Sequence, residues 1–208
     1  MDHNDKKARF DAMLDFVGCF PTISGLQPTS FEELGDGVML FEALSHISPR
    51  DFDPSTIARG LGDNWALKSS NLRKLVRNLE TYYHEVLQKT ANFEDVAASI
   101  PSISRNSDKD AIAKIVELVA AAAVTCENRA DYVGWIMSMS EESQAHMKGV
   151  IESSMSKLTD YELDEETDED EVDDELVFDS DGDEDEYCSP QSSPVSNMNG
   201  LFRGSSED

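Results

Sequence analysis

The chain has 208 residues, of which 39% are hydrophobic, and it carries a net charge of −26. This length suits one ordinary domain and a tail, and the negative charge argues against nucleic-acid binding, which needs a net basic face. No segment approaches the roughly 18 apolar residues of a membrane span, and no signal peptide is recognisable. Three cysteines, Cys19, Cys126 and Cys188, show neither a metal-binding spacing nor a disulfide framework. We therefore expect a cytoplasmic protein.

The charge is distributed unevenly along the chain. Residues 159–186 contain 18 Asp and Glu and no Lys or Arg, whereas residues 1–158 hold 16 basic and 23 acidic residues, a net charge of −7. A segment with such charge density and few apolar residues cannot collapse into a core. We therefore predict a globular domain in residues 1–158 and a disordered acidic tail, containing Ser and Pro, in residues 159–208.

The first half of the domain predicts three helices. Residues 5–20 place apolar side chains on one face, and Pro21 ends the pattern. Ser30 and Glu33 have the spacing of a capping box, which predicts that a second helix starts there. The third helix, residues 63–87, has Asp63 as its cap and would be about 36 Å long. Its apolar face consists of Trp65, Leu72, Leu75, Val76, Leu79, Tyr82, Tyr83, Val86 and Leu87.

The second half predicts further helices and no strand. A short helix in residues 92–105 is expected to end before Pro101, with a polar link at 102–107. Ser107 would cap the next helix, which is apolar nearly all round and so should be the most buried. Helices at 130–139 and 141–158 follow, and Ser140 would cap the last one. Because no run of alternating polarity predicts a strand, we expect an all-α bundle of about seven to nine helices.

Basic residues lie on the long helix, away from its apolar face: Lys68, Arg73, Lys74 and Arg77. One interpretation is that they are the solvated residues of a core helix. The other is that they form a basic surface for an acidic partner such as a microtubule.

The same helix carries a resemblance to a known family. Gly62-Asp63-Asn64-Trp65, then Leu67-Lys68, Ser70-Asn71-Leu72 and Tyr83-His84-Glu85-Val86-Leu87, resembles the N-terminal Hook domain of the Hook family of dynein adaptors. Leu34-Gly35-Asp36-Gly37-Val38 is similar to the segment that starts the second core helix of calponin-homology domains. The resemblance covers residues 8–158. It implies a calponin-homology-like bundle with an extra C-terminal helix, in a protein associated with microtubules or the centrosome.

The resemblance extends to residues 126–155 and implies a binding groove there. In the Hook family this region forms a hydrophobic groove that receives an amphipathic helix of the dynein light intermediate chain, and a Gln and an Ile seven residues apart carry much of the contact. They match Gln144 and Ile151, and the expected groove comprises Gln144, Met147, Ile151, Met155, Ile136 and Met137. The spacing of residues 144, 147, 151 and 155 independently predicts one stripe, and methionines adapt well to a partner helix. Spacing alone equally allows this stripe to dock the helix on its own domain.

No catalytic motif is present. None of the four histidines falls in HExxH or in a Cys/His cluster, and the chain has no P-loop and no G-x-S-x-G. The aspartates around Gly182 do not have EF-hand spacing. We therefore expect a non-enzymatic protein without a cofactor or metal. Ser180, in acidic surroundings, and Ser189 and Ser193, each followed by proline, are candidates for phosphorylation.

No heptad pattern follows Leu158. A dynein adaptor normally continues into a long coiled coil, so we expect this protein to act as a binder, competitor or tether rather than as an activator of dynein movement. A scaffold whose acidic tail recruits basic partners is a further alternative.

Overall fold

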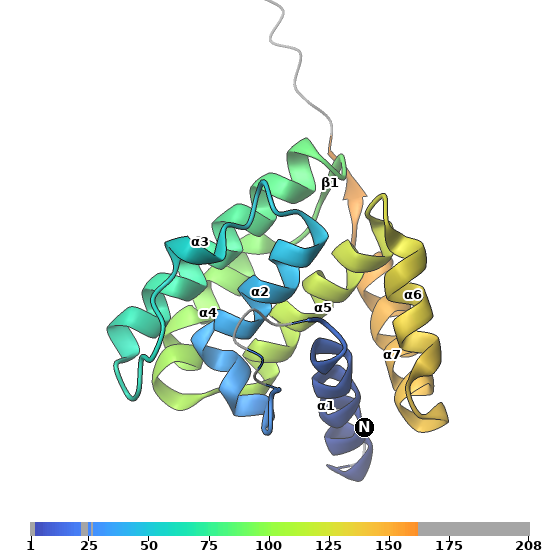
Figure 1. Cartoon of the computed structure of the whole chain (residues 1–208), viewed down its shortest axis with the longest axis horizontal. Coiled ribbons are helices and arrows are strands. Elements are labelled where there is room, and N and C mark those ends of the chain that lie inside the picture. Colours follow the sequence, from blue (N-terminus) through green and yellow to red (C-terminus); the bar gives the residue numbers. More distant parts are fainter. Residues whose placement is uncertain (1–2, 22–24, 26, 162–208) are drawn as a thin grey trace, which may run out of the picture. The chain divides into compact units, whose positions relative to one another are not determined.

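We describe the protein from a computed structural model, which covers residues 3–21, 25 and 27–161 (Figure 1). The described elements, in chain order, are α1 (His3–Gly18), η1 (Phe31–Asp36), α2 (Val38–Ile47), η2 (Pro54–Thr56), α3 (Trp65–Glu85), β1 (Lys89–Thr90), α4 (Phe93–Asn106), α5 (Lys109–Thr125), α6 (Arg129–Ser138), α7 (Glu141–Met155) and β2 (Thr159–Asp160). The prediction of an all-α bundle is confirmed. The predicted tail and its three serines, Ser180, Ser189 and Ser193, lie outside the described residues.

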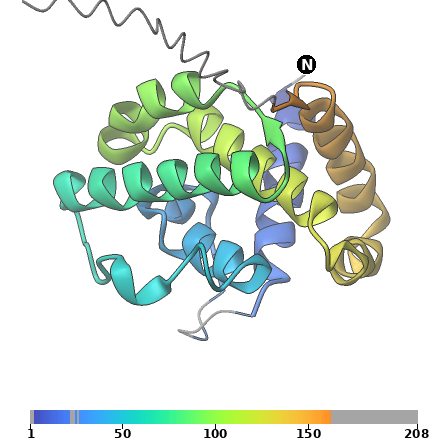
Figure 2. The same cartoon turned by 90° about the horizontal axis from the view of Figure 1, so that it is seen from above.

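Helix α5 forms the centre of the bundle. Its buried residues include Ile112, Ile115, Val116 and Val119, together with a run of alanines at 120–123, and it packs against α1, α2, α4, α6 and α7. The small alanine side chains allow these neighbouring helices to approach closely. The prediction that this helix is the most buried is confirmed. Figure 2 shows α6 and α7 at one end of the bundle and the first turn of α3 at the other.

Helix α3 is two residues shorter at each end than the predicted range 63–87. Asn64, not Asp63, caps it: its Oδ1 accepts hydrogen bonds from the N–H groups of Ala66 and Leu67 at 3.2 Å. The predicted apolar face is buried from Leu72 to Tyr83. Trp65 and Val86, at the two ends of this face, are exceptions, with 49% and 53% of their surface exposed. The ring of Trp65 carries the guanidinium of Arg105 at 4.3 Å from the centroid.

Ser30 is the N-cap residue of η1, as predicted, but its side chain makes no capping hydrogen bond, so the predicted capping box is not formed. The Glu33 carboxylate instead binds Thr29, the residue before Ser30. It accepts hydrogen bonds from the Thr29 N–H at 3.0 Å and from the Thr29 hydroxyl at 2.6 Å. The helix is also divided in two at Gly37, whose φ of 77° suits glycine. A Cβ at Gly37 would lie 3.3 Å from Cδ2 of Leu72, so the break lets α2 and α3 pack closely.

Helix α4 passes through Pro101, so the prediction that it ends there is wrong. Proline removes one helical N–H donor, but Ile100 and Ile103 on either side of it are both buried. Their packing holds the helix together across the missing hydrogen bond. Asp108 rather than Ser107 then caps α5, because its Oδ1 accepts from the backbone of residues 110 and 111.

A short antiparallel ribbon follows α3 and ends the described part of the protein. Lys89 pairs with Asp160, and Thr90 with Thr159. Beyond it the ring of Tyr161 stacks on His84, with centroids 4.0 Å apart and planes within 5°. Two-residue strands give no alternating pattern, which is why the sequence did not predict them. The ribbon fastens the segment after α7 to the end of α3.

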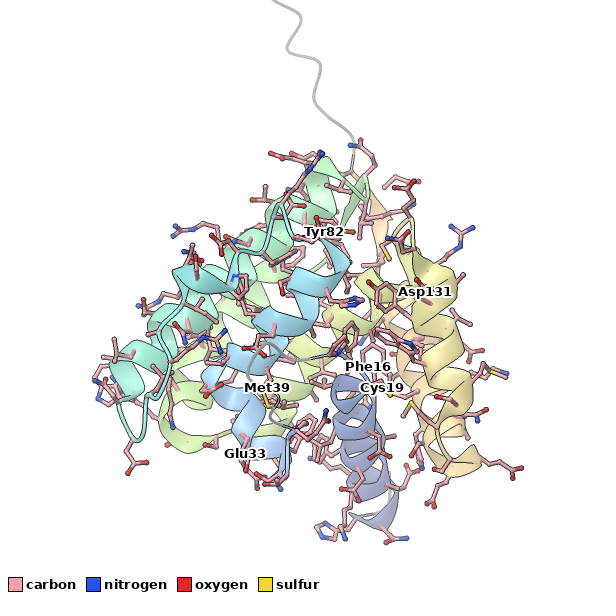
Figure 3. The ribbon with its side chains drawn as sticks, in the orientation of Figure 1. Phe16, Cys19, Glu33, Met39, Tyr82 and Asp131 are labelled. Atoms are coloured by element: carbon pink, nitrogen blue, oxygen red, sulfur yellow. The ribbon has the colours of Figure 1, made fainter. Side chains whose placement is uncertain are left out.

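An aromatic cluster joins α1 to α6. Phe20 packs edge-on against Phe16, whose position Figure 3 labels, and stacks on Tyr132 with centroids 5.5 Å apart. Trp135 packs edge-on against both Phe20 and Tyr132. Burial raises the pKa of Tyr132 to about 12. One side of α6 is thereby fixed to the bundle.

Candidate partner-helix groove

Helix α7 is anchored at its start and along one side. Ser140 caps it as predicted, with its Oγ accepting from the N–H of Ser143 at 3.1 Å. The Ser143 hydroxyl donates to Asp15 of α1 at 2.7 Å. Met147 and Val150 are buried against the core. This anchoring leaves the opposite side of α7 facing α6.

A cavity of about 510 Å³ lies between α5, α6 and α7. We call it the α6–α7 groove; its lining residues are Val124, Val133, Ile136, Met137, Glu141, Gln144, Ala145, Lys148, Ile151 and Glu152. Helix α6 buries only Tyr132 and Ile136. Val133 is 43% and Met137 66% exposed. An apolar wall is therefore open to solvent along α6.

The structure brings together four of the six residues predicted for the groove. Ile136, Met137, Gln144 and Ile151 line it, and their contact with a partner stays a prediction. Met147 does not line it, so its assignment was wrong: the side chain is fully buried in the core. Spacing places Met147 and Ile151 on one stripe, but only the packed neighbours decide which of the two is covered.

Met155 lies beyond the groove lining. It is 39% exposed, and its sulfur is 3.5 Å from the hydroxyl of Thr125. Val124, Val133 and Ala145 line the groove but were not predicted for it. Val133 and Met137 are apolar residues four positions apart in a predicted helix. This spacing in the sequence could have identified the side of α6 that lines the groove.

Gln144 connects the two helices that border the groove. Its Nε2 donates to the carbonyl oxygen of Met137 at 3.0 Å and to that of Met139 at 2.8 Å. These carbonyls belong to the C-terminal end of α6, where helical partners are lacking. The Gln144 amide therefore holds α6 beside α7, and its oxygen remains as a hydrogen-bond acceptor at the groove.

The α7 side of the groove is charged, unlike the α6 side. Glu141, Lys148 and Glu152 all line it. The Lys148 amine lies 3.8 Å from a Glu152 oxygen, one turn away. Glu141 makes no ion pair with any residue that the structure describes, and it stands in the first turn of α7, where the helix dipole favours a negative charge.

The predicted basic surface of α3 is only partly exposed. Arg73 and Arg77 are exposed, Lys68 and Lys74 are half-buried, and none of the four pairs with a carboxylate in the described part of the protein. The Lys74 amine instead donates to the backbone carbonyl of Thr56 at 3.1 Å. These residues lie outside the α6–α7 groove.

The described residues, 3–161 apart from the loop positions 22–24 and 26, contain no group of three or more His, Cys, Asp or Glu that could hold a metal ion. None of their helices is long and apolar enough to cross a membrane.

The protein is a calponin-homology-like helical bundle that carries an open groove between its last two helices. Comparison with known proteins identifies the family to which this chain belongs. The family model of the HOOK domain matches residues 10–153, and the chain belongs to this family. Residues 10–153 thus form a Hook domain.

Relatives and a solved structure agree with this assignment. The chain is 33% identical to Protein Hook homolog 1 of Gallus gallus and to Protein Hook homolog 3 of Homo sapiens, in each case over 150 residues, 71% of this chain and 20% of the relative. The solution structure of a conserved domain of mouse HOOK1 superposes with a TM-score of 0.67 at 27% identity, covering 75% of this chain and 95% of that domain. The match thus spans about a fifth of the length of these relatives.

Proposed function

We propose that this protein is a non-catalytic adaptor module that binds an amphipathic helix of the dynein light intermediate chain in the α6–α7 groove. The observation that carries the proposal is the open apolar surface made by Val133, Met137 and Ile151. Exposed apolar surface of this kind, bordered by polar residues, is typical of a protein interaction site. Its place of action would be the cytoplasm, at microtubules or the centrosome.

The dimensions of the groove suit a helix. From Glu141 to Glu152 the lining follows α7 for three turns, about 16 Å at 1.5 Å per residue. A partner helix of three to four turns would place apolar residues at i, i+3 or i+4, and i+7 against Val133, Met137 and Ile151. Met137, with its flexible side chain, can adapt to the partner's shape.

Calorimetric titration of the full-length protein with a peptide that comprises the C-terminal helix of the dynein light intermediate chain tests the proposal. We expect a dissociation constant on the order of micromolar. Ile151→Ala should weaken binding strongly, because it removes part of the apolar lining of the groove. Val86→Ala is the matched control, since Val86 is also exposed, at 53%, but lies outside the groove. Absence of binding by the folded wild type, or equal binding by both variants, would refute the proposal.

The exposed basic residues of α3 favour a second candidate, direct binding to microtubules. Arg73 and Arg77 have no carboxylate partner among the described residues and face solvent. Such binding should weaken steeply between low and physiological salt, whereas binding in the groove, whose contact is mainly apolar, should respond less. Co-sedimentation of the wild type and of Arg73→Glu/Arg77→Glu with microtubules distinguishes the two. Unchanged pelleting of the variant would exclude this surface.

A further inference from the structure

The two walls of the α6–α7 groove differ in chemistry. The α6 wall is apolar, with Val133, Ile136 and Met137. The α7 rim carries Glu141, Lys148 and Glu152. A helix that lies in the groove therefore meets apolar side chains on one flank and ionised groups on the other. The apolar wall sets affinity, and the charged rim can select between partners.

The rim charges do not cancel. Lys148 is already matched by Glu152 at 3.8 Å, one turn further along α7. Glu141 has no cationic partner among the residues that the structure describes, so the rim has a net charge of −1. A Lys four residues before a Glu is the less favourable order for such a pair. Glu152 can therefore exchange Lys148 for a cation of the partner at small cost.

We infer that the groove selects an amphipathic helix whose polar flank is basic, with Lys or Arg opposite Glu141 and again opposite Glu152. The inference rests on the proposed function and specifies its partner. The two carboxylates are eleven residues apart on α7, about 16 Å. A partner helix that lies nearly parallel or antiparallel to α7 meets both with cations about three turns apart. A partner with acidic residues at the same positions faces like charge and is disfavoured.

Two model peptides test the inference on the full-length protein. They share one apolar stripe and differ only at two flank positions eleven residues apart, which are Lys in one peptide and Glu in the other. Each exposed ion pair contributes about a two- to five-fold change in affinity, so the Lys peptide should bind the wild type several-fold more tightly. In Glu141→Gln/Glu152→Gln this preference should largely disappear. Glutamine keeps the size and helix compatibility of both positions.

The acidic segment at 159–186 attracts any basic peptide, so a control variant with the same change in net charge is needed. Glu80→Gln/Glu85→Gln changes two carboxylates on α3, outside the groove, and should leave the preference unchanged. Ile151→Ala identifies the fraction of binding that occurs in the groove. A Lys preference in Glu141→Gln/Glu152→Gln as large as in Glu80→Gln/Glu85→Gln overturns the inference. Equal affinity of the wild type for both peptides also overturns the inference. If Ile151→Ala weakens the binding of both, the groove remains the binding site but does not select by charge. Failure of both peptides to respond to Ile151→Ala would instead count against the proposed function.

Discussion

The side-chain nitrogen of Gln144 lies 2.8 Å from the carbonyl oxygen of Met139 and 3.0 Å from that of Met137. A glutamine expected to contact a partner is thus already engaged within the domain. Its nitrogen satisfies carbonyls at the end of α6, and only its oxygen can accept a hydrogen bond from a bound helix. Gln144 therefore acts on the groove in two ways, by positioning α6 and by offering an acceptor.

Replacing Gln144 by Glu separates these roles. Glutamate has the same size and keeps the acceptor, but it places a carboxylate beside two carbonyl oxygens and leaves both without a donor. We expect the free energy of unfolding to fall by about 1–3 kcal/mol. Amide hydrogen exchange in residues 129–139 should become faster, because the end of α6 loses its attachment.

Glu152→Gln is the control for this change, since it alters charge on the same helix without touching the α6 carbonyls. If Gln144→Glu leaves exchange in α6 unchanged while it abolishes partner binding, Gln144 acts only as a direct contact and the positioning role is wrong.

Met147 and Ile151 should respond oppositely to truncation, although both belong to the stripe of α7. Met147 is fully buried, so Met147→Ala should lower the free energy of unfolding by about 2–5 kcal/mol. Ile151 is half-buried and lines the groove, so Ile151→Ala should cost less stability but more affinity. Urea unfolding and calorimetric titration of both variants measure the two effects. Equal stability losses would show that Ile151 also belongs to the core.

This pair shows how far the sequence can predict the site. The spacing of residues 144, 147, 151 and 155 correctly indicated one stripe of a helix. It could not show that Met147 is buried in the core while Ile151 lines the groove, because that depends on packing between elements distant in the sequence. The resemblance to the Hook family supplied the functional expectation for Gln144 and Ile151, but not the hydrogen bonds of Gln144 to α6.

The fold was predictable where the signal was local. The Ser140 cap needs only the next few residues, and the structure confirms it. The wrong boundary at Pro101 has the opposite cause, because buried Ile100 and Ile103 outweigh the helix-breaking effect of proline. The ribbon pairs Lys89 with Asp160, which are 71 residues apart. No local pattern can predict such a contact.

Asp36 should make stability depend on pH in an unusual direction. Its carboxylate accepts the N–H of Val38, the first residue of α2, at 2.8 Å, but burial, the largest effect, raises its pKa. A raised pKa in the folded state means that folding favours the protonated form. The contribution of Asp36 is therefore greatest below its unfolded pKa of about 3.9, and it decreases as the pH rises through the folded pKa.

Asp36→Asn tests this effect, because asparagine keeps the acceptor oxygen and removes the charge. The variant should gain stability relative to the wild type near neutral pH, and the difference should shrink as the pH approaches about 3.9. Urea unfolding at several pH values measures it. A variant that is less stable than the wild type near neutral pH would mean that the ionised carboxylate stabilises the fold.

Tyr161 should stabilise the domain through its ring and not through its hydroxyl. The ring stacks on His84 at 4.0 Å, next to the ribbon that ties the segment after α7 to the end of α3. Tyr161→Ala should lower the free energy of unfolding by about 0.5–1.5 kcal/mol. Tyr161→Phe keeps the stacked ring and should behave like the wild type. Hydrogen exchange at residues 86–90 should rise only in the alanine variant, since the ribbon then loses its support. If both variants lose the same stability, the hydroxyl is responsible and the stacked ring is not.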